Sequence, residues 1–192
     1  MKLTELAIAS VFAAAIVPFA SMADDAVTPV TGSNTGVINF TGSVVNTPCN
    51  IKQESLKQDI DFGQLSRKAL ESGTQAEQNF NIEFTGCDFN NYSKNEAGEA
   101  AAVKTMKIVF TGQNYAGDTN NFLATSRNNA NNLGISIDGF EFGEESDVLS
   151  KMTNKVGDNT LTFTALAEAI DKTKTVGEGK FSAVSNFRIT YE

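Results

Sequence analysis

The sequence predicts an all-β chain folded as an antiparallel β-sandwich, and three features carry this prediction. Apolar residues alternate near the carboxyl terminus, at Phe187, Ile189 and Tyr191, with the period of a strand that buries one face. Several further β-rich segments are short and are separated by clusters of Asn, Gly, Ser and Asp. The chain also begins like an exported protein, and sandwiches are common among cell-surface domains.

The amino terminus has the organisation of a secretory signal peptide. A basic residue precedes a weakly polar to apolar run, Leu6–Val17, and the small residues Ser21 and Ala23 occupy the two positions that signal peptidase reads. The run is about twelve residues long, which is too short for a membrane-spanning helix. We therefore expect residues 1–23 to be removed and the remainder to form one domain behind a short extension.

The charge of the chain argues against two classes of partner. The formal net charge is −8 at pH 7, and basic residues form no cluster. Nucleic acid and anionic lipid both attract basic patches, so neither is an expected partner. We interpret the acidity as a source of solubility.

The two cysteines, Cys49 and Cys87, are expected to pair, because disulfide formation is the default in an oxidising compartment. Free thiols are the alternative. Two thiols are too few for a metal site, and the chain contains no histidine. A disulfide closing this loop stabilises a fold by about 4 kcal/mol in the chain-entropy model.

The composition also argues against catalysis. Without histidine the chain holds neither a Ser-His-Asp nor a Cys-His arrangement. The acidic residues Glu144, Glu145 and Asp147 match no calcium-loop spacing and read as a solvated face. No phosphate-binding glycine motif is present. We expect a protein that is not an enzyme and that needs no cofactor and no metal.

The first strands are predicted from β-branched and aromatic content. Residues 37–45 are rich in Val, Ile and Phe, residues 60–62 form a short alternating piece, and residues 80–84 alternate cleanly before Cys87. Three later strands are expected over 106–112, 133–137 and 161–165, and the last one over 181–191. Two alanine-rich segments, 97–104 and 165–172, compete as helical turns, although the second starts with a period of two.

The segment before the first predicted strand has no compact pattern of its own. It leads into Gly36, Ile38, Phe40 and Gly42, which share one side of a strand. One interpretation is a loose amino-terminal tail. The other is a strand that is donated to another molecule.

Taken in order, these segments resemble the pilin subunits of chaperone–usher fimbriae in Gram-negative bacteria, especially the major shaft subunits of type 1 and P-like fimbriae. The resemblance covers nearly the whole chain after the signal peptide. It rests on Gly36–Val45, Pro48–Ile51, Phe62–Leu65, Phe80–Cys87, Phe110–Gly112, Leu161–Ala165 and the terminal block ending in Tyr191 and Glu192.

The resemblance implies an incomplete immunoglobulin-like β-sandwich that lacks its final strand and is completed by donor-strand complementation. It assigns residues 24–42 to the amino-terminal donor extension and residues 43–192 to the pilin domain. Gly36, Ile38 and Phe40 match the donor residues of the family. The carboxyl-terminal strand that contacts the chaperone is represented by Gly179, Phe187, Ile189 and Tyr191.

The resemblance further implies a structural subunit that polymerises head to tail by donor-strand exchange and supports adhesion. Its expected partners are a periplasmic pilus chaperone, an outer-membrane usher and neighbouring pilin subunits, on a path through the periplasm to a surface fimbrium. The alternative is a minor fimbrial adaptor or a glycan-binding adhesin subunit. The chain contains no tryptophan, a residue common in sugar-binding sites, which weighs against an adhesin.

Overall fold

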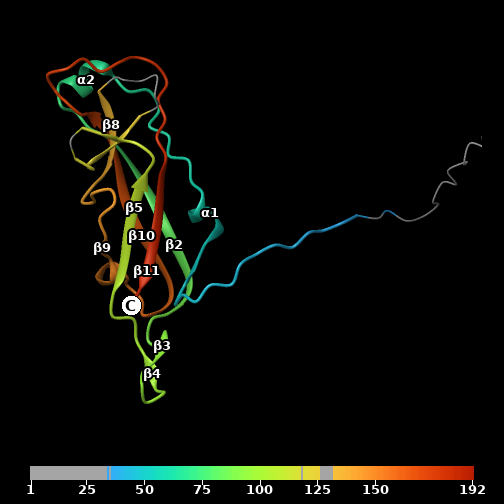
Figure 1. Cartoon of the computed structure of the whole chain (residues 1–192). Helices are drawn as coiled ribbons and strands as arrows, with labels where there is room; N and C mark the ends of the chain where they lie inside the picture. Colours follow the sequence, from blue (N-terminus) through green and yellow to red (C-terminus); the bar gives the residue numbers. More distant parts are fainter. Residues whose placement is uncertain (1–33, 35, 118, 126–131) are drawn as a thin grey trace, which may run out of the picture. The chain divides into compact units, whose positions relative to one another are not determined.

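The computed structural model describes residues 34, 36–117, 119–125 and 132–192 (Figure 1). The chain divides into two compact units, Met1–Ser43 and Val44–Glu192, and each is considered by itself. The predicted signal peptide and the first ten residues of the predicted extension, 24–33, lie outside the described residues.

The described residues of the second unit form two antiparallel sheets and a small hairpin. The larger sheet has the strand order β1-β2-β10-β8-β7-β6, and the smaller sheet has the order β11-β5-β9. The strands of the larger sheet are β1 Asn50–Ile51, β2 Ala76–Asp88, β6 Tyr115–Ala116, β7 Phe122–Ala124, β8 Leu133–Ile137 and β10 Val156–Ala169. The smaller sheet contains β5 Met106–Gly112, β9 Ser146–Asp147 and β11 Ser185–Tyr191, and the hairpin pairs β3 Ser93–Lys94 with β4 Ala100–Ala101. Three short helices complete the unit: α1 Gln53–Leu56, α2 Arg67–Glu71 and the 3-10 turn Leu149–Lys151.

The core lies between the two sheets, and the first part of β10 shows how apolar and polar side chains alternate across a strand that faces it. In β10, Leu161 and Phe163 are buried, whereas the intervening Thr162 is exposed. Phe163 meets Phe110 of β5 edge to face, with ring centroids 5.2 Å apart. Each such buried side chain contributes about 1.5–3 kcal/mol, so this interdigitation holds the sheets together.

Several strand predictions are confirmed. The predicted strands 106–112 and 133–137 are β5 and β8 with the same bounds. Residues 80–84 lie inside β2, and residues 161–165 lie inside β10. The helical alternatives are wrong: residues 100–101 form β4, and β10 continues to Ala169 before the chain turns.

Other predicted strands form no ladder in the single chain. Residues 60–62 lie in an extended segment without strand pairing. Residues 37–45 also form no strand, and Val37, Ile38 and Phe40 are 87%, 77% and 89% exposed. A strand needs a partner for its backbone groups, and a sequence pattern alone does not provide one.

Gly134 in β8 is a position where the fold excludes a side chain. A Cβ atom there would lie 2.9 Å from Ile170 Cγ1 and 2.9 Å from Phe122 Cβ. We expect Gly134→Ala to lower the free energy of unfolding by about 1–3 kcal/mol, as overpacking does, in urea denaturation of the full chain. Gly42→Ala is the control, because a Cβ at Gly42 meets nothing within 4 Å. Equal stability of the two variants would contradict the packing argument.

Candidate functional site

The carboxyl-terminal strand β11 has one paired and one open edge. β11 pairs with β5 in an antiparallel register that sets Phe187 opposite Phe110 and Tyr191 opposite Met106. β11 ends the order of the smaller sheet, so no strand in the described part of the chain pairs with its other edge. Such an edge presents backbone N–H and C=O groups that are free to accept another strand.

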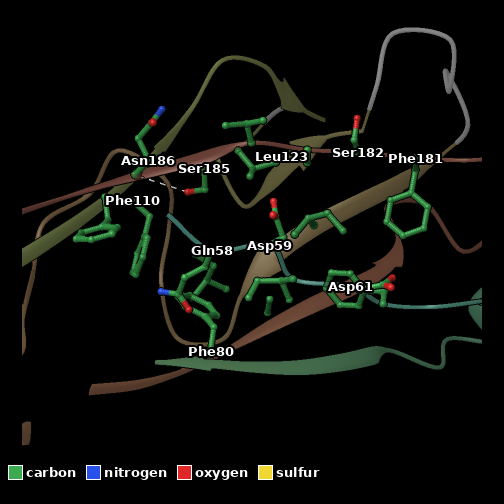
Figure 2. A pocket seen from close by; sticks show the side chains of 18 of the residues that line it. Gln58, Asp59, Asp61, Phe80, Phe110, Leu123, Phe181, Ser182, Ser185 and Asn186 are labelled. Carbon is green, nitrogen blue, oxygen red and sulfur yellow. Dashed lines mark hydrogen bonds between the residues drawn. The ribbon is translucent and has the colours of Figure 1, made fainter. Parts of the chain in front are cut away.

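A groove of about 1520 Å³ runs along this open edge. One wall is β11 together with the segment 177–184 that precedes it, and the other wall is the segment 55–65 (Figure 2). Core side chains from both sheets form the floor of the groove: Phe80, Phe110, Leu123, Ile135, Ile137 and Ala165. The groove therefore opens directly onto the hydrophobic core, which a sandwich with all its strands would cover.

Three apolar side chains at every second position of β11 face this groove. Phe187, Ile189 and Tyr191 line it and are half-buried. Ser185 and Asn186 line its edge at the start of the strand, whereas Arg188 is exposed and does not line it. Arg188 Nη2 lies 3.6 Å from Glu145 Oε1, so this side chain is engaged away from the groove. The predicted residues Phe187, Ile189 and Tyr191 thus lie together on the groove side of the strand.

Gly179 lies apart from these three residues. It precedes β11, belongs to the groove-lining segment 177–184 and has a φ of 124°, a region that glycine adopts without steric strain. The donor residues Gly36, Ile38 and Phe40 belong to the first unit and lie outside every strand of the described chain.

The opposite wall of the groove is held by side chains rather than by a ladder. No backbone–backbone hydrogen bond joins residues 57–65 to any described residue. Instead, Gln58 Nε2 donates to the Asn81 carbonyl at 2.8 Å, and the Gly63 amide donates to Asp61 Oδ1 at 2.8 Å. This wall was missed as part of the site, although the alternation of Ile60 and Phe62 signals an extended segment with one apolar side.

The disulfide lies beside the groove. Cys49 and Cys87 are bonded and buried, as predicted. The bond fastens the residue before β1 to β2, and β1 pairs with β2 over Asn50 and Ile51. Because Cys49 and Ile51 also line the groove, the disulfide fixes this part of its lining.

Tyr191 marks the carboxyl-terminal end of the groove. Its ring lies 6.2 Å from that of Tyr92, and burial, with a smaller effect of Tyr92, raises the pKa of the Tyr191 phenol to about 12. The unfolded chain ionises the Tyr191 phenol near pH 10, so the contribution of the buried neutral phenol to stability is present below pH 10 and is lost as the pH rises through 12.

Ultraviolet difference titration should show an ionisation near pH 12 that Tyr191→Phe removes. Its persistence in that variant would contradict the assignment.

Two kinds of feature are absent from the described residues. They contain no group of three or more Cys, Asp or Glu side chains placed to hold a metal ion. No helix among them is long and apolar enough to cross a membrane.

The geometry defines a class of protein: an immunoglobulin-like sandwich that lacks its last strand and exposes the vacant strand position as a groove. A family model described as "Fimbrial protein" matches residues 38–192, and the chain belongs to that family. It is a structural subunit of a cell-surface fimbria, in a family of structural pilins rather than of enzymes.

Individual relatives agree with this assignment. The chain is 35% identical to the Pap fimbrial major pilin protein of Escherichia coli over 85% of this chain and 88% of the relative. It is 34% identical to the F7-2 fimbrial protein of Escherichia coli over 96% and 97% of the two chains. These are fimbrial pilins, so the alternative of a minor adaptor or a glycan-binding adhesin is not favoured.

Solved structures show the same fold. The crystal structure of the P pilus rod subunit PapA is 32% identical, matches with a TM-score of 0.60 and covers 76% of this chain and 100% of that chain. A subunit in the structure of a chaperone–usher pilus is 31% identical, matches with a TM-score of 0.67 and covers 86% and 100%. The incomplete immunoglobulin-like sandwich predicted from the sequence is confirmed.

Proposed function

We propose that the groove beside β11 accepts the amino-terminal extension of a neighbouring copy, so that the chain polymerises head to tail by donor-strand exchange. The observation that carries this proposal is the coincidence of an open edge on β11 with a groove onto the core. A strand added there finds backbone partners on its edge and apolar pockets for alternate side chains.

The donor is residues 24–42, with Gly36, Ile38 and Phe40 as the side of the strand that enters the groove. These residues alternate in phase, and Ile38 and Phe40 are large apolar side chains that are exposed in the single chain. Burying both in a neighbour removes apolar surface from water on each partner. Residues 43–192 form the accepting domain.

Before assembly, a periplasmic pilus chaperone protects the same groove. It contacts Phe187, Ile189 and Tyr191 of the carboxyl-terminal strand, with Gly179 at the start of the contacting segment. The exposed core at the floor of the groove supports this step, because an uncovered apolar groove drives aggregation in water. The signal peptide, residues 1–23, directs the chain to the periplasm, and an outer-membrane usher exchanges the chaperone for the next extension.

The filament is a repeating head-to-tail assembly rather than a closed ring. A donor at one end of the chain and an acceptor groove elsewhere make a heterologous contact, which generates an open filament. The shaft of the fimbria is the place where such a repeating subunit fits, and the major pilin relatives support that position.

The experiment is a mixture of full-length chain with a tagged chain that lacks residues 24–42. The truncated chain retains its groove but has no strand to donate. It should therefore accept the extension of one neighbour and stop growth of the filament at that end. Electron microscopy of tag-labelled material should show label only at one end of shortened filaments. Label at internal positions would contradict the proposal, and a truncation of residues 24–30 serves as the control that preserves the donor residues.

A further inference from the structure

The hairpin of β3 and β4 extends from one end of the second unit. Its base is held where the Val103 amide donates to the Phe89 carbonyl at 2.8 Å, and both of these side chains are buried. Beyond this base, residues 93–101 are exposed except for the half-buried Ala101. β3 and β4 form a two-stranded sheet of their own. Figure 1 shows this hairpin beyond the two larger sheets, at the end that carries the carboxyl terminus, with α2 at the opposite end.

The tip of the hairpin is ordered and acidic. The Asn95 amide donates to the Glu99 carbonyl at 2.9 Å, and the Glu99 amide donates to Asn95 Oδ1 at 2.9 Å. Glu96 and Glu99 are exposed, and neither carboxylate forms an ion pair with a described residue. A preformed turn that presents two carboxylates loses little conformational entropy when it binds a partner.

The opposite end of the unit gathers lysines that are far apart in the sequence. Lys68 belongs to α2, and Lys172 and Lys174 follow β10. The two segments are adjacent, because a Cβ atom at Gly73, just after α2, would lie 3.2 Å from Lys172 Nζ. All three lysines are exposed. We call Lys68, Lys172 and Lys174 the α2-end lysines.

These lysines give their end of the unit a local excess of positive charge. Residues 66–74 and 170–180 hold five Lys and Arg against three Asp and Glu, on a chain whose net charge is −8. Lys68 and Lys172 form no ion pair with a described residue, whereas Lys174 Nζ lies 3.1 Å from Asp171 Oδ2. The acidic hairpin and the α2-end lysines are therefore complementary in charge.

The proposed donor strand sets these two ends of neighbouring copies against each other. The last strand of an immunoglobulin-like sheet runs antiparallel to its neighbour, so the carboxyl end of the donor lies beside the amino end of β11. The chain approaches this end of β11 from Val176, whose amide donates to Glu71 Oε1 of α2 at 3.0 Å. From there, residues 43–48 connect the donor to Cys49 of its own domain and span at most about 20 Å.

The hairpin lies at the end of the domain where this connection arrives. The Asp88 amide, at the end of β2, donates to the Pro48 carbonyl at 2.8 Å, and β3 begins five residues later at Ser93. One arm of the hairpin, residues 91–97, spans about 23 Å when extended. The arm is thus as long as the connection, and its tip can reach the α2 end of the copy that holds the donor strand.

We propose that the hairpin of each copy docks through Glu96 and Glu99 on the α2-end lysines of the copy that holds its extension. This inference rests on the proposed function. Exposed ion pairs contribute little by themselves. The extension already ties the two copies together, so a contact too weak to join separate chains forms within the filament. The docked hairpin restrains bending at the connection formed by residues 43–48.

The first test is cross-linking of wild-type filaments with a water-soluble carbodiimide, which joins a carboxylate to an amine only where the two are in contact. The filaments are assembled from equal parts of isotopically labelled and unlabelled subunits, so that mass spectrometry separates links between copies from links within one copy. We expect amide bonds from Glu96 or Glu99 of one copy to the α2-end lysines of another. Filaments in which these links are missing, or join only residues of the same copy, would overturn the docking.

The second test reverses the charges and measures the persistence length of the filaments by electron microscopy. Glu96→Lys with Glu99→Lys places like charges opposite each other and should shorten the persistence length by about twofold or more. Adding Lys68→Glu and Lys172→Glu to this variant should restore the wild-type value, and the same cross-link should form with carboxylate and amine exchanged. Glu54→Lys with Glu141→Lys is the matched control, because it changes the net charge equally at two other exposed carboxylates and should leave bending unchanged.

The outcomes distinguish the docking from the function on which it rests. Stiffness that is lost in the hairpin variant and restored by the compensating lysine substitutions supports the docking. Equal stiffness of the hairpin variant and the control overturns it, and so does a loss that the compensating substitutions do not repair. In each of these cases filaments form, so strand donation stands. A wild-type chain that forms no filament overturns strand donation itself, and the docking with it.

Discussion

The substitution Ile38→Asp is expected to stop filament assembly. Asn39→Asp, which places the same carboxylate one residue later, is not. Ile38 belongs to the side of the donor strand that enters the groove, and Asn39 lies on the opposite side. Burying an uncompensated carboxylate against an apolar floor costs several kcal/mol. Ile38→Asp should therefore reduce the rate of assembly by at least about a hundredfold.

The measurement is electron microscopy together with size-exclusion chromatography of the full chain. Asn39→Asp is the matched control, because it adds the same charge to the neighbouring residue and keeps the apolar side intact. Ile38→Asp subunits should still join the growing end of wild-type filaments through their own groove. Equal loss of assembly in the two variants would show that net charge, and not the phase of the strand, governs the contact.

Removal of the disulfide is expected to have the next largest effect. Replacement of Cys49 and Cys87 by serine frees the denatured chain from a long closed loop and should lower the free energy of unfolding by about 4 kcal/mol. That loss is a large fraction of the stability of a typical domain. It should also reduce the yield of chaperone-bound subunit, since Cys49 and Ile51 line the groove.

Urea denaturation of the serine variant, compared with wild type before and after reduction by dithiothreitol, checks this prediction. The reduced wild type should unfold at the same denaturant concentration as the variant. A variant as stable as the oxidised wild type would show that the bond does not constrain the fold.

Much of the sandwich could be predicted from local patterns. Residues 106–112 and 133–137 form β5 and β8 with the predicted bounds, because both segments are apolar and their ends are marked by turn residues. The alanine-rich residues 97–104 contain a short strand, β4, where their composition favours a helical turn. Helix propensity is a weak preference, and pairing with β3 overrides it at Ala100 and Ala101.

The site could be predicted only in part. The period of two placed Phe187, Ile189 and Tyr191 on one side of a strand, and they line the groove together. The predicted strand began at residue 181, but residues 181–184 leave the ladder. Phe181 instead contacts Phe62, and the Val176 amide donates to Glu71 of α2. Contacts between segments far apart in the chain determine this path, so no local pattern in one sequence reports it.

The position of the disulfide determines how the domain carries mechanical load. A pull on the extension enters the domain at Cys49, and β1 offers only two residues of ladder to resist being peeled away. The covalent link to Cys87 passes the force directly to β2, which pairs with β10 almost along its whole length. Tension on the extension is thereby passed to the longest strand pair of the described chain without peeling β1 away from β2.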